Sequence, residues 1–243
     1  MNLALVGYGN MGKEVERQAK LRGHAVAWTA DTYDQLTQPG LPAIDCAMEF
    51  TVPDQTVRNI DVLAARGTSV VVGTTGWYDA LPEVKAIVAR RKIGLLYSPN
   101  FSLGVQLFWN IIAHAATLMD AFDDYDVFGH EWHHARKADA PSGTAKRTAE
   151  IILEHLRRKR TLITETLARP LCPEELHFTS TRGGSVPGTH TVSFDSPFDT
   201  IDITHTARNR SGFAVGAVRA AEWLRGKTGL FTMDDFLRDV LPH

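Results

Sequence analysis

Four side chains that can carry charge or move a proton are crowded into residues 133–137. His133 and His134 are adjacent, and Arg136 and Lys137 follow them closely. A histidine exchanges a proton near neutral pH, whereas arginine and lysine remain cations. This combination is suited to binding an anion and delivering a proton to it.

A helix is predicted to begin directly after this cluster. Ser142 is a favourable N-cap, and apolar side chains recur behind it at helical spacing, at Ala145, Ala149, Ile152 and Leu156. The amide N–H groups near Gly143 and Thr144 then have no acceptor within the helix, so they attract carboxylate or phosphate. The sequence therefore predicts an anion site at this helix start, with Lys137 completing the charge balance.

Two other interpretations of the stretch are open. A solvated basic loop would explain any one of these residues alone, but a site explains all of them beside one helix start. Residues 130–134 also match the H-E-x-x-H pattern, which binds zinc when both histidines lie on one helical face. A helix is disfavoured here because Gly129 precedes the motif and Pro141 follows it soon after. We therefore expect no metal.

The N-terminal segment contains a dinucleotide-binding pattern. Residues 3–6 are a short apolar run typical of a strand buried on both faces, and a helical pattern ends near Gly23. Between them lies a G-x-G-x-x-G loop, whose glycines allow a tight turn and a close approach of pyrophosphate to a helix start. The loop consists of Gly7, Tyr8, Gly9, Asn10, Met11 and Gly12.

An acidic residue follows the second predicted strand, which covers residues 24–29. Asp31 lies about 20 residues beyond the glycines, where a carboxylate accepts hydrogen bonds from the adenosine ribose. The alternative is an ordinary turn residue at a strand end. Because residues 25–39 contain no arginine or lysine, we expect NADH to serve at least as well as NADPH.

Strands and helices alternate as far as residue 102. Further strands are predicted at residues 45–51, 69–72 and 93–97, with helices between them. This alternation indicates an α/β fold with a doubly wound parallel sheet. Gly73, Thr74 and Thr75 follow the fourth strand, where ligands of such sheets bind, although a plain turn would also explain them.

The pattern changes after residue 102. A long apolar helix is predicted at residues 103–119, and strands then dominate, at residues 125–129, 176–181, 190–194 and 200–206. Strands grouped in this way predict an α+β domain with a mixed or antiparallel sheet. Helices at residues 213–224 and 233–240 are expected to return to the first domain. The predicted domains are thus residues 1–102 with 211–243, and residues 103–210.

Composition excludes several classes of protein. The 243 residues carry a net charge of −2, which argues against a nucleic-acid partner. The two cysteines, Cys46 and Cys172, are far apart in the sequence, as is usual in a reducing compartment. No apolar run reaches membrane-spanning length. We therefore expect a cytoplasmic protein without a membrane partner.

Taken together, the motifs resemble those of the 4-hydroxy-tetrahydrodipicolinate reductase (dihydrodipicolinate reductase) family. Residues 131–145 fit that family's signature E-x-H-H-x-x-K-x-D-x-P-S-G-T-A throughout. Supporting matches lie at residues 7–12, 73–76, 100–105, 182–190 and 213–217. The resemblance covers nearly the whole chain, and it implies a Rossmann-like domain, a mixed-sheet domain and a homotetramer.

The resemblance also implies a role for individual residues. His133 would be the general acid/base and Lys137 a second proton donor. The carboxylates of a cyclic dicarboxylate substrate would be bound by His134, Gly143 and Thr144. NADH or NADPH would be held by the residues of the first glycine-rich loop, by Asp31, by Gly73, Thr74 and Thr75, and by Ser98, Pro99, Asn100 and Phe101.

Three alternative functions remain open at this point. The chain could reduce a different small dicarboxylate, or it could be a non-catalytic regulator that responds to NAD. A zinc metallopeptidase is the third, and it requires the H-E-x-x-H pattern to be helical.

Overall fold

The computed structural model describes residues 1–241 of the chain. Its contacts divide it into two compact units. One combines Met1–Leu103 with the C-terminal segment that starts at Arg210, and the other spans Gly104–Asn209. Both chain ends therefore belong to the same unit.

The first unit is built on a parallel sheet with the strand order β11-β5-β4-β3-β1-β2. In chain order its strands are β1 (Asn2–Val6), β2 (Ala25–Ala30), β3 (Cys46–Glu49), β4 (Ser69–Val72), β5 (Gly94–Tyr97) and β11 (Gly229–Phe231). Its helices are α1 (Asn10–Leu21), α2 (Tyr33–Leu36), α3 (Pro53–Ala65), the 3-10 helix η1 (Tyr78–Ala80), α4 (Leu81–Arg91), α7 (Ser211–Leu224) and α8 (Met233–Val240).

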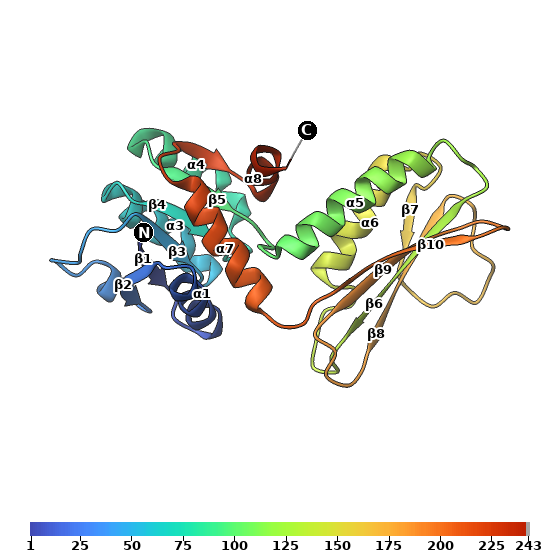
Figure 1. The fold of residues 1–243 in the computed structure, drawn as a ribbon, viewed down its shortest axis with the longest axis horizontal. Helices are drawn as coiled ribbons and strands as arrows, with labels where there is room; N and C mark the ends of the chain where they lie inside the picture. The colour runs from blue at the N-terminus through green and yellow to red at the C-terminus, as the bar shows by residue number, and fades with distance from the viewer. Residues whose placement is uncertain (242–243) are drawn as a thin grey trace. The chain divides into compact units, whose positions relative to one another are not determined.

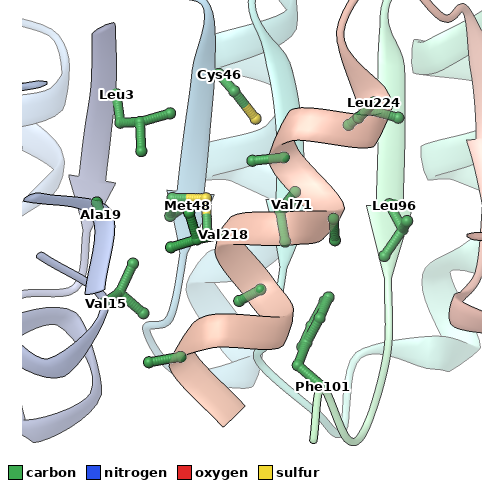
Figure 2. Close-up of a cluster of buried hydrophobic side chains, with 14 of the residues drawn as sticks. Leu3, Val15, Ala19, Cys46, Met48, Val71, Leu96, Phe101, Val218 and Leu224 are labelled. Atoms are coloured by element: carbon green, nitrogen blue, oxygen red, sulfur yellow. The ribbon is translucent and has the colours of Figure 1, made fainter. Parts of the chain in front are cut away.

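Helices cover both faces of this sheet, because the central strands β1, β4 and β5 carry buried apolar side chains on both sides. Figure 1 shows these helices around the sheet. Leu3 and Leu5 pack with α1, α7 and α8, whereas Ala4 and Val6 pack with α3 and α4. Figure 2 shows α7 lying along the strands of the sheet, with Val218 near Met48 and Val71. The predicted doubly wound parallel sheet is confirmed.

The second unit is a five-stranded mixed sheet in the order β10-β9-β6-β8-β7. Its strands are β6 (Asp126–His133), β7 (Thr161–Ile163), β8 (Glu175–Arg182), β9 (Thr189–Asp195) and β10 (Thr200–Thr206). Strand β6 is parallel to β8 and antiparallel to β9. The helices α5 (Leu103–Met119) and α6 (Gly143–His155) pack through Ile112 and Ile152 on the face that carries Phe178 and Phe194.

Several predicted boundaries were wrong. Strand β6 was expected to end at residue 129, but it continues to His133 because its pairing with β8 and β9 supplies partners along the whole length. The H-E-x-x-H residues therefore lie on and just beyond a strand, which does not have the helical spacing that zinc peptidases need. Strand β3 ends at Glu49, two residues earlier than expected. Helix α2 and the strands β7 and β11 were not predicted.

Candidate functional site

The first glycine-rich loop is closely packed at the carboxyl end of β1. Gly7 has a φ of +91°, and a Cβ atom there would lie 2.2 Å from the carbonyl oxygen of Phe50. A Cβ on Gly12 would lie 2.3 Å from the carbonyl oxygen of Gly7. Only glycine fits both positions. Gly9, the N-cap of α1, faces open space, so a ligand can approach the backbone there.

Asp31, which was predicted to bind the adenosine ribose, lies beside this loop. Its carboxylate accepts a hydrogen bond from the backbone N–H of Tyr8, and it shares a pocket of about 470 Å³ with Gly7, Tyr33 and Asn59. Arg58 of α3 stacks on the ring of Tyr33 at 3.3 Å. The structure thus brings a cation near the pocket that the local sequence around Asp31 did not reveal.

The loop after β4 is fixed by a carboxyl group that sequence reasoning missed. Thr74 donates from Oγ1 to Glu49 Oε2 at 2.6 Å and accepts from the backbone N–H of Thr51 at 2.8 Å. Glu49 is fully buried, and burial raises its pKa. A Cβ on Gly73 would lie 2.1 Å from the ring of Phe50. Gly73 and Thr74 therefore anchor this loop, and Thr75 remains exposed beside them.

Residues 98–101 form a tight turn after β5. Ser98 donates from Oγ to the carbonyl oxygen of Asn100 at 2.8 Å, and Asn100 accepts from the backbone N–H of Ser102 at 2.9 Å. Phe101 is buried in the apolar core, whereas Pro99 is exposed. The side chains of this predicted group thus mainly shape the turn.

In the second unit, β6 and the start of α6 are joined by one buried carboxylate. Glu131 Oε1 accepts from the backbone N–H of Ser142 at 2.8 Å, and Oε2 accepts from the Ser142 hydroxyl. Ser142 is the N-cap of α6, where its Oγ accepts from the N–H of Ala145 at 3.2 Å. The predicted helix start is confirmed. Gly143, the first residue of the helix, is exposed with open space around it, and Thr144 follows it.

His133 is the last residue of β6 and is 8% exposed. Its Nδ1 lies 3.3 Å from Glu131 Oε2, and its Nε2 would lie 2.9 Å from a Cβ on Gly188. Burial lowers the pKa of His133 to about 4, although the Glu131 carboxylate acts in the opposite direction. At neutral pH the ring is therefore uncharged before a ligand binds.

Lys137 and His134 lie in the turn after β6. Lys137 Nζ pairs with Asp139 Oδ1 at 2.6 Å, and its charge helps to lower the pKa of His133. The Nδ1 atom of His134 is buried and has no hydrogen-bond partner among residues 1–241. An anion at the start of α6 would compete with Asp139 for the lysine.

The sequence analysis did not identify three residues that contact the Glu131 carboxylate. Arg182 NH2 donates to Glu131 Oε1 at 2.8 Å, and His190 Nε2 lies 3.3 Å from Glu131 Oε2. Ser180 donates to the same carboxylate at 2.8 Å. They meet because Glu131 is paired with Ser180 on β8 and with His190 on β9. No local pattern could have revealed this register.

The same groups have a composition that could bind a metal. Glu131, His133 and His190 each offer a ligand atom, and these atoms lie within 4.8 Å of one another. The Glu131 carboxylate already forms an ion pair with Arg182, so a second cation would meet electrostatic repulsion. We therefore interpret the cluster as a buried polar network, in which the Ser142 hydroxyl links Glu131 to His190 and the His133 ring lies beside the carboxylate.

Comparison with known proteins identifies the family. The family model for the C-terminus of dihydrodipicolinate reductase matches residues 104–237, and that for the N-terminus matches residues 19–101. The chain is 40% identical over 245 residues to 4-hydroxy-tetrahydrodipicolinate reductase of Christiangramia forsetii, with complete coverage of both chains. It is 41% identical over 198 residues to that of Archaeoglobus fulgidus, which covers 79% of this chain and 76% of the relative.

A solved structure is similar in fold. A dipicolinate-bound dihydrodipicolinate reductase from Paenisporosarcina sp. TG-14 superposes with a TM-score of 0.76 at 23% identity, covering 99% of this chain and all of the other. The two family models together span most of the chain. The sequence identity of 40% over the full length of a relative is high enough to indicate a shared family. This chain therefore belongs to the dihydrodipicolinate reductase family.

Proposed function

We propose that this oxidoreductase uses NADH or NADPH to reduce 4-hydroxy-tetrahydrodipicolinate to tetrahydrodipicolinate, with loss of water, in lysine and diaminopimelate biosynthesis. Family membership supports the reaction. The observation that carries the proposal is the junction of β6 and α6, where a buried histidine and an uncovered helix start are held by one carboxylate.

The helix start would bind substrate carboxylate. The N–H groups of Gly143 and Thr144 are at the positive end of α6, and Gly143 leaves room for a ligand. His134 would add a donor from the neighbouring turn. Lys137 would neutralise charge and act as the second proton donor after leaving Asp139.

His133 would deliver the proton that the reduced carbon skeleton needs. Its uncharged ring must first take up a proton, and the carboxylates of the substrate would favour this because opposite charge raises a histidine pKa. The bound nucleotide would supply the hydride. General acid catalysis of this kind is typically worth about 10²–10⁴ in rate.

The first unit would hold the nucleotide. The close packing of Gly7 and Gly12 and the open backbone at Gly9 fit a pyrophosphate, and Asp31 lies in the adjoining pocket where a ribose would be bound. The loops at Gly73–Thr75 and Ser98–Phe101 end neighbouring strands of the same sheet. We propose that NADH serves at least as well as NADPH. Steady-state kinetic constants measured with each nucleotide test this preference.

Two further properties belong to this proposal. Exposed Phe128 and Trp132 lie on the outer face of the second sheet, which supports assembly into a homotetramer through that face. A cytoplasmic location is supported by two free cysteines. No helix within residues 1–241 has the length and apolar character needed to cross a bilayer.

An assay with freshly generated hydroxy-tetrahydrodipicolinate tests the reaction. We expect substrate-dependent oxidation of NADH by the wild-type protein, and a loss of about 10²-fold or more in turnover for His133→Ala with unchanged nucleotide binding. Turnover only with other imine or keto dicarboxylates would indicate a different oxidoreductase. Binding of NADH without turnover of any of these substrates would indicate a regulator.

A further inference from the structure

The Glu131 carboxylate forms several polar contacts in the second unit, and the proposed reaction assigns it no role. Its side chain is fully buried. Oε1 accepts from the Ser142 N–H, the Ser180 hydroxyl and the Arg182 guanidinium, each at 2.8 Å. Oε2 accepts from the Ser142 hydroxyl and lies 3.3 Å from both His133 Nδ1 and His190 Nε2.

This environment keeps Glu131 ionised. Burial alone would raise the pKa of its carboxyl, but hydrogen bonds from His190, Ser142 and Arg182 outweigh burial and hold the pKa well below the usual range. A carboxylate with several donors and an arginine partner is stable in a buried site.

The position of Glu131 relative to His133 is set by the strand. The two residues are two positions apart on β6, so their side chains lie on the same face. Nδ1 of the imidazole lies 3.3 Å from Glu131 Oε2 and, among residues 1–241, forms no hydrogen bond in this structure, whereas Nε2 lies beside Gly188 in the loop between β8 and β9. A proton on Nδ1 would therefore face Glu131 and leave Nε2 for a ligand.

Four charged or titratable groups face His133. They come from β6 (Glu131), from the turn after it (Lys137), from β8 (Arg182) and from β9 (His190). Of these four, Glu131 alone is an anion. The other three oppose the formation of an imidazolium, and Glu131 favours it.

We propose that Glu131 is the positioning residue of this site: it holds His133 in the Nδ1–H tautomer, stabilises the imidazolium, and through Ser142 fixes the start of α6. One carboxylate would thus set both the proton donor and the helix start that binds substrate. The inference rests on the proposed function for its catalytic consequence, but the tautomer does not depend on the substrate.

The first experiment compares Glu131→Gln with Glu175→Gln. Glu175 is a matched control, because it is also a buried, arginine-paired carboxylate on the same sheet, but its partner is Arg169. We expect Glu131→Gln to lower kcat about 10²-fold and to move the basic limb of the kcat–pH profile down by about one pH unit, since an anion beside His133 is lost. Glu175→Gln should change neither. If Glu131→Gln lowers kcat but leaves the basic limb of the kcat–pH profile in place, Glu131 does not position His133 and has only a structural role.

The second experiment uses the unaltered protein, so it remains decisive if Glu131→Gln fails to fold. Nitrogen-15 NMR of the histidine rings at neutral pH reports the tautomer, with His133→Asn used to assign the signal. We expect Nδ1–H for His133. An Nε2–H tautomer would overturn the inference. An Nδ1–H tautomer in a protein that does not reduce hydroxy-tetrahydrodipicolinate would instead contradict the proposed function alone.

Discussion

At the scale of the residue, His133 is subject to two opposing effects. Burial lowers its pKa to about 4, and the neighbouring carboxylate resists that change. A folded-state pKa below the unfolded value of about 6.5 means that the unfolded chain binds the proton first. The contribution of His133 to stability is therefore fully present above pH 6.5 and falls as the pH decreases from about 6.5 towards 4.

The same shift predicts a difference between two pH profiles. The profile of kcat/KM reports the free enzyme, where His133 titrates at a low pH, and the profile of kcat reports the substrate complex. Because substrate carboxylates raise the pKa of a nearby imidazole, the basic limb of kcat should lie at higher pH than that of kcat/KM. Steady-state kinetics across the pH range measures both. Basic limbs at the same pH in the two profiles would show that bound substrate does not change the pKa of His133.

Gly188 offers a steric test of the same imidazole. It has a φ of +151°, and a Cβ there would lie 2.9 Å from His133 Nε2, so Gly188→Ala forces the ring or the loop to move. We expect kcat to fall about tenfold or more, with the nucleotide dissociation constant unchanged, because misplaced groups lose catalytic efficiency steeply. Gly183→Ala is the control, since that position in the same loop faces open space. Equal effects of both variants would argue against the contact.

At the scale of the element, close approach of backbones decides where helices lie. Gly216 of α7 packs on residue 101, where a Cβ would lie 1.7 Å from the carbonyl oxygen of Phe101. Helix α7 can therefore rest on the turn that follows β5 and direct Val218 and Leu224 into the core (Figure 2). The glycine is required by packing, although it lowers the intrinsic helix propensity.

Two glycine substitutions in α7 distinguish the effect of close packing from the effect of intrinsic helix propensity. Gly216→Ala should lower the free energy of unfolding by about 1–3 kcal/mol or more, because the added methyl overlaps a carbonyl oxygen. At Gly212 the nearest atom to an added Cβ is 3.6 Å away, so alanine should be neutral or stabilising by up to about 1 kcal/mol. Urea unfolding monitored by circular dichroism measures both. Similar stabilities of the two variants would contradict the packing argument.

At the scale of the whole molecule, strand β6 of the second sheet carries two large apolar side chains that are exposed. Phe128 and Trp132 are 43% and 50% exposed, while Val127 and Glu131 point to the opposite, buried face of β6. On β8, Phe128 is paired with His177 and Trp132 with Thr181. A sheet face with large exposed apolar side chains is suited to contact with further copies of the chain.

Charge on this face should prevent the proposed assembly. If the proposed homotetramer forms, Trp132→Asp should convert it to smaller species, because an ionised carboxylate is costly to bury in an interface. Leu21→Asp is the control, since Leu21 is 70% exposed and lies at the end of α1 in the first unit. Light scattering after size-exclusion chromatography measures the mass. A wild-type protein that is monomeric at micromolar concentration would contradict the prediction.

The sequence predicted the parts of the fold that have a strong local signal. Buried strands such as residues 69–72 and long apolar helices such as residues 103–119 were located at the boundaries that the structure shows. Strands β7 and β11 have three residues each, too few to show a periodic pattern, so they were missed. The end of β6 was also misplaced, because its last residues pair with β8 and β9 rather than follow a local rule.

By itself, the sequence determined which groups this protein has for chemistry: the glycine-rich turn after β1, the Ser142 cap of α6 and the histidines beside it. Each of these depends on residues close together in the chain, so each can be inferred from spacing. The tertiary structure alone decided that Glu131 meets Arg182 and His190, that Arg58 reaches Tyr33, and that His133 is buried with a lowered pKa. These depend on strand register and burial, which bring together residues far apart in sequence.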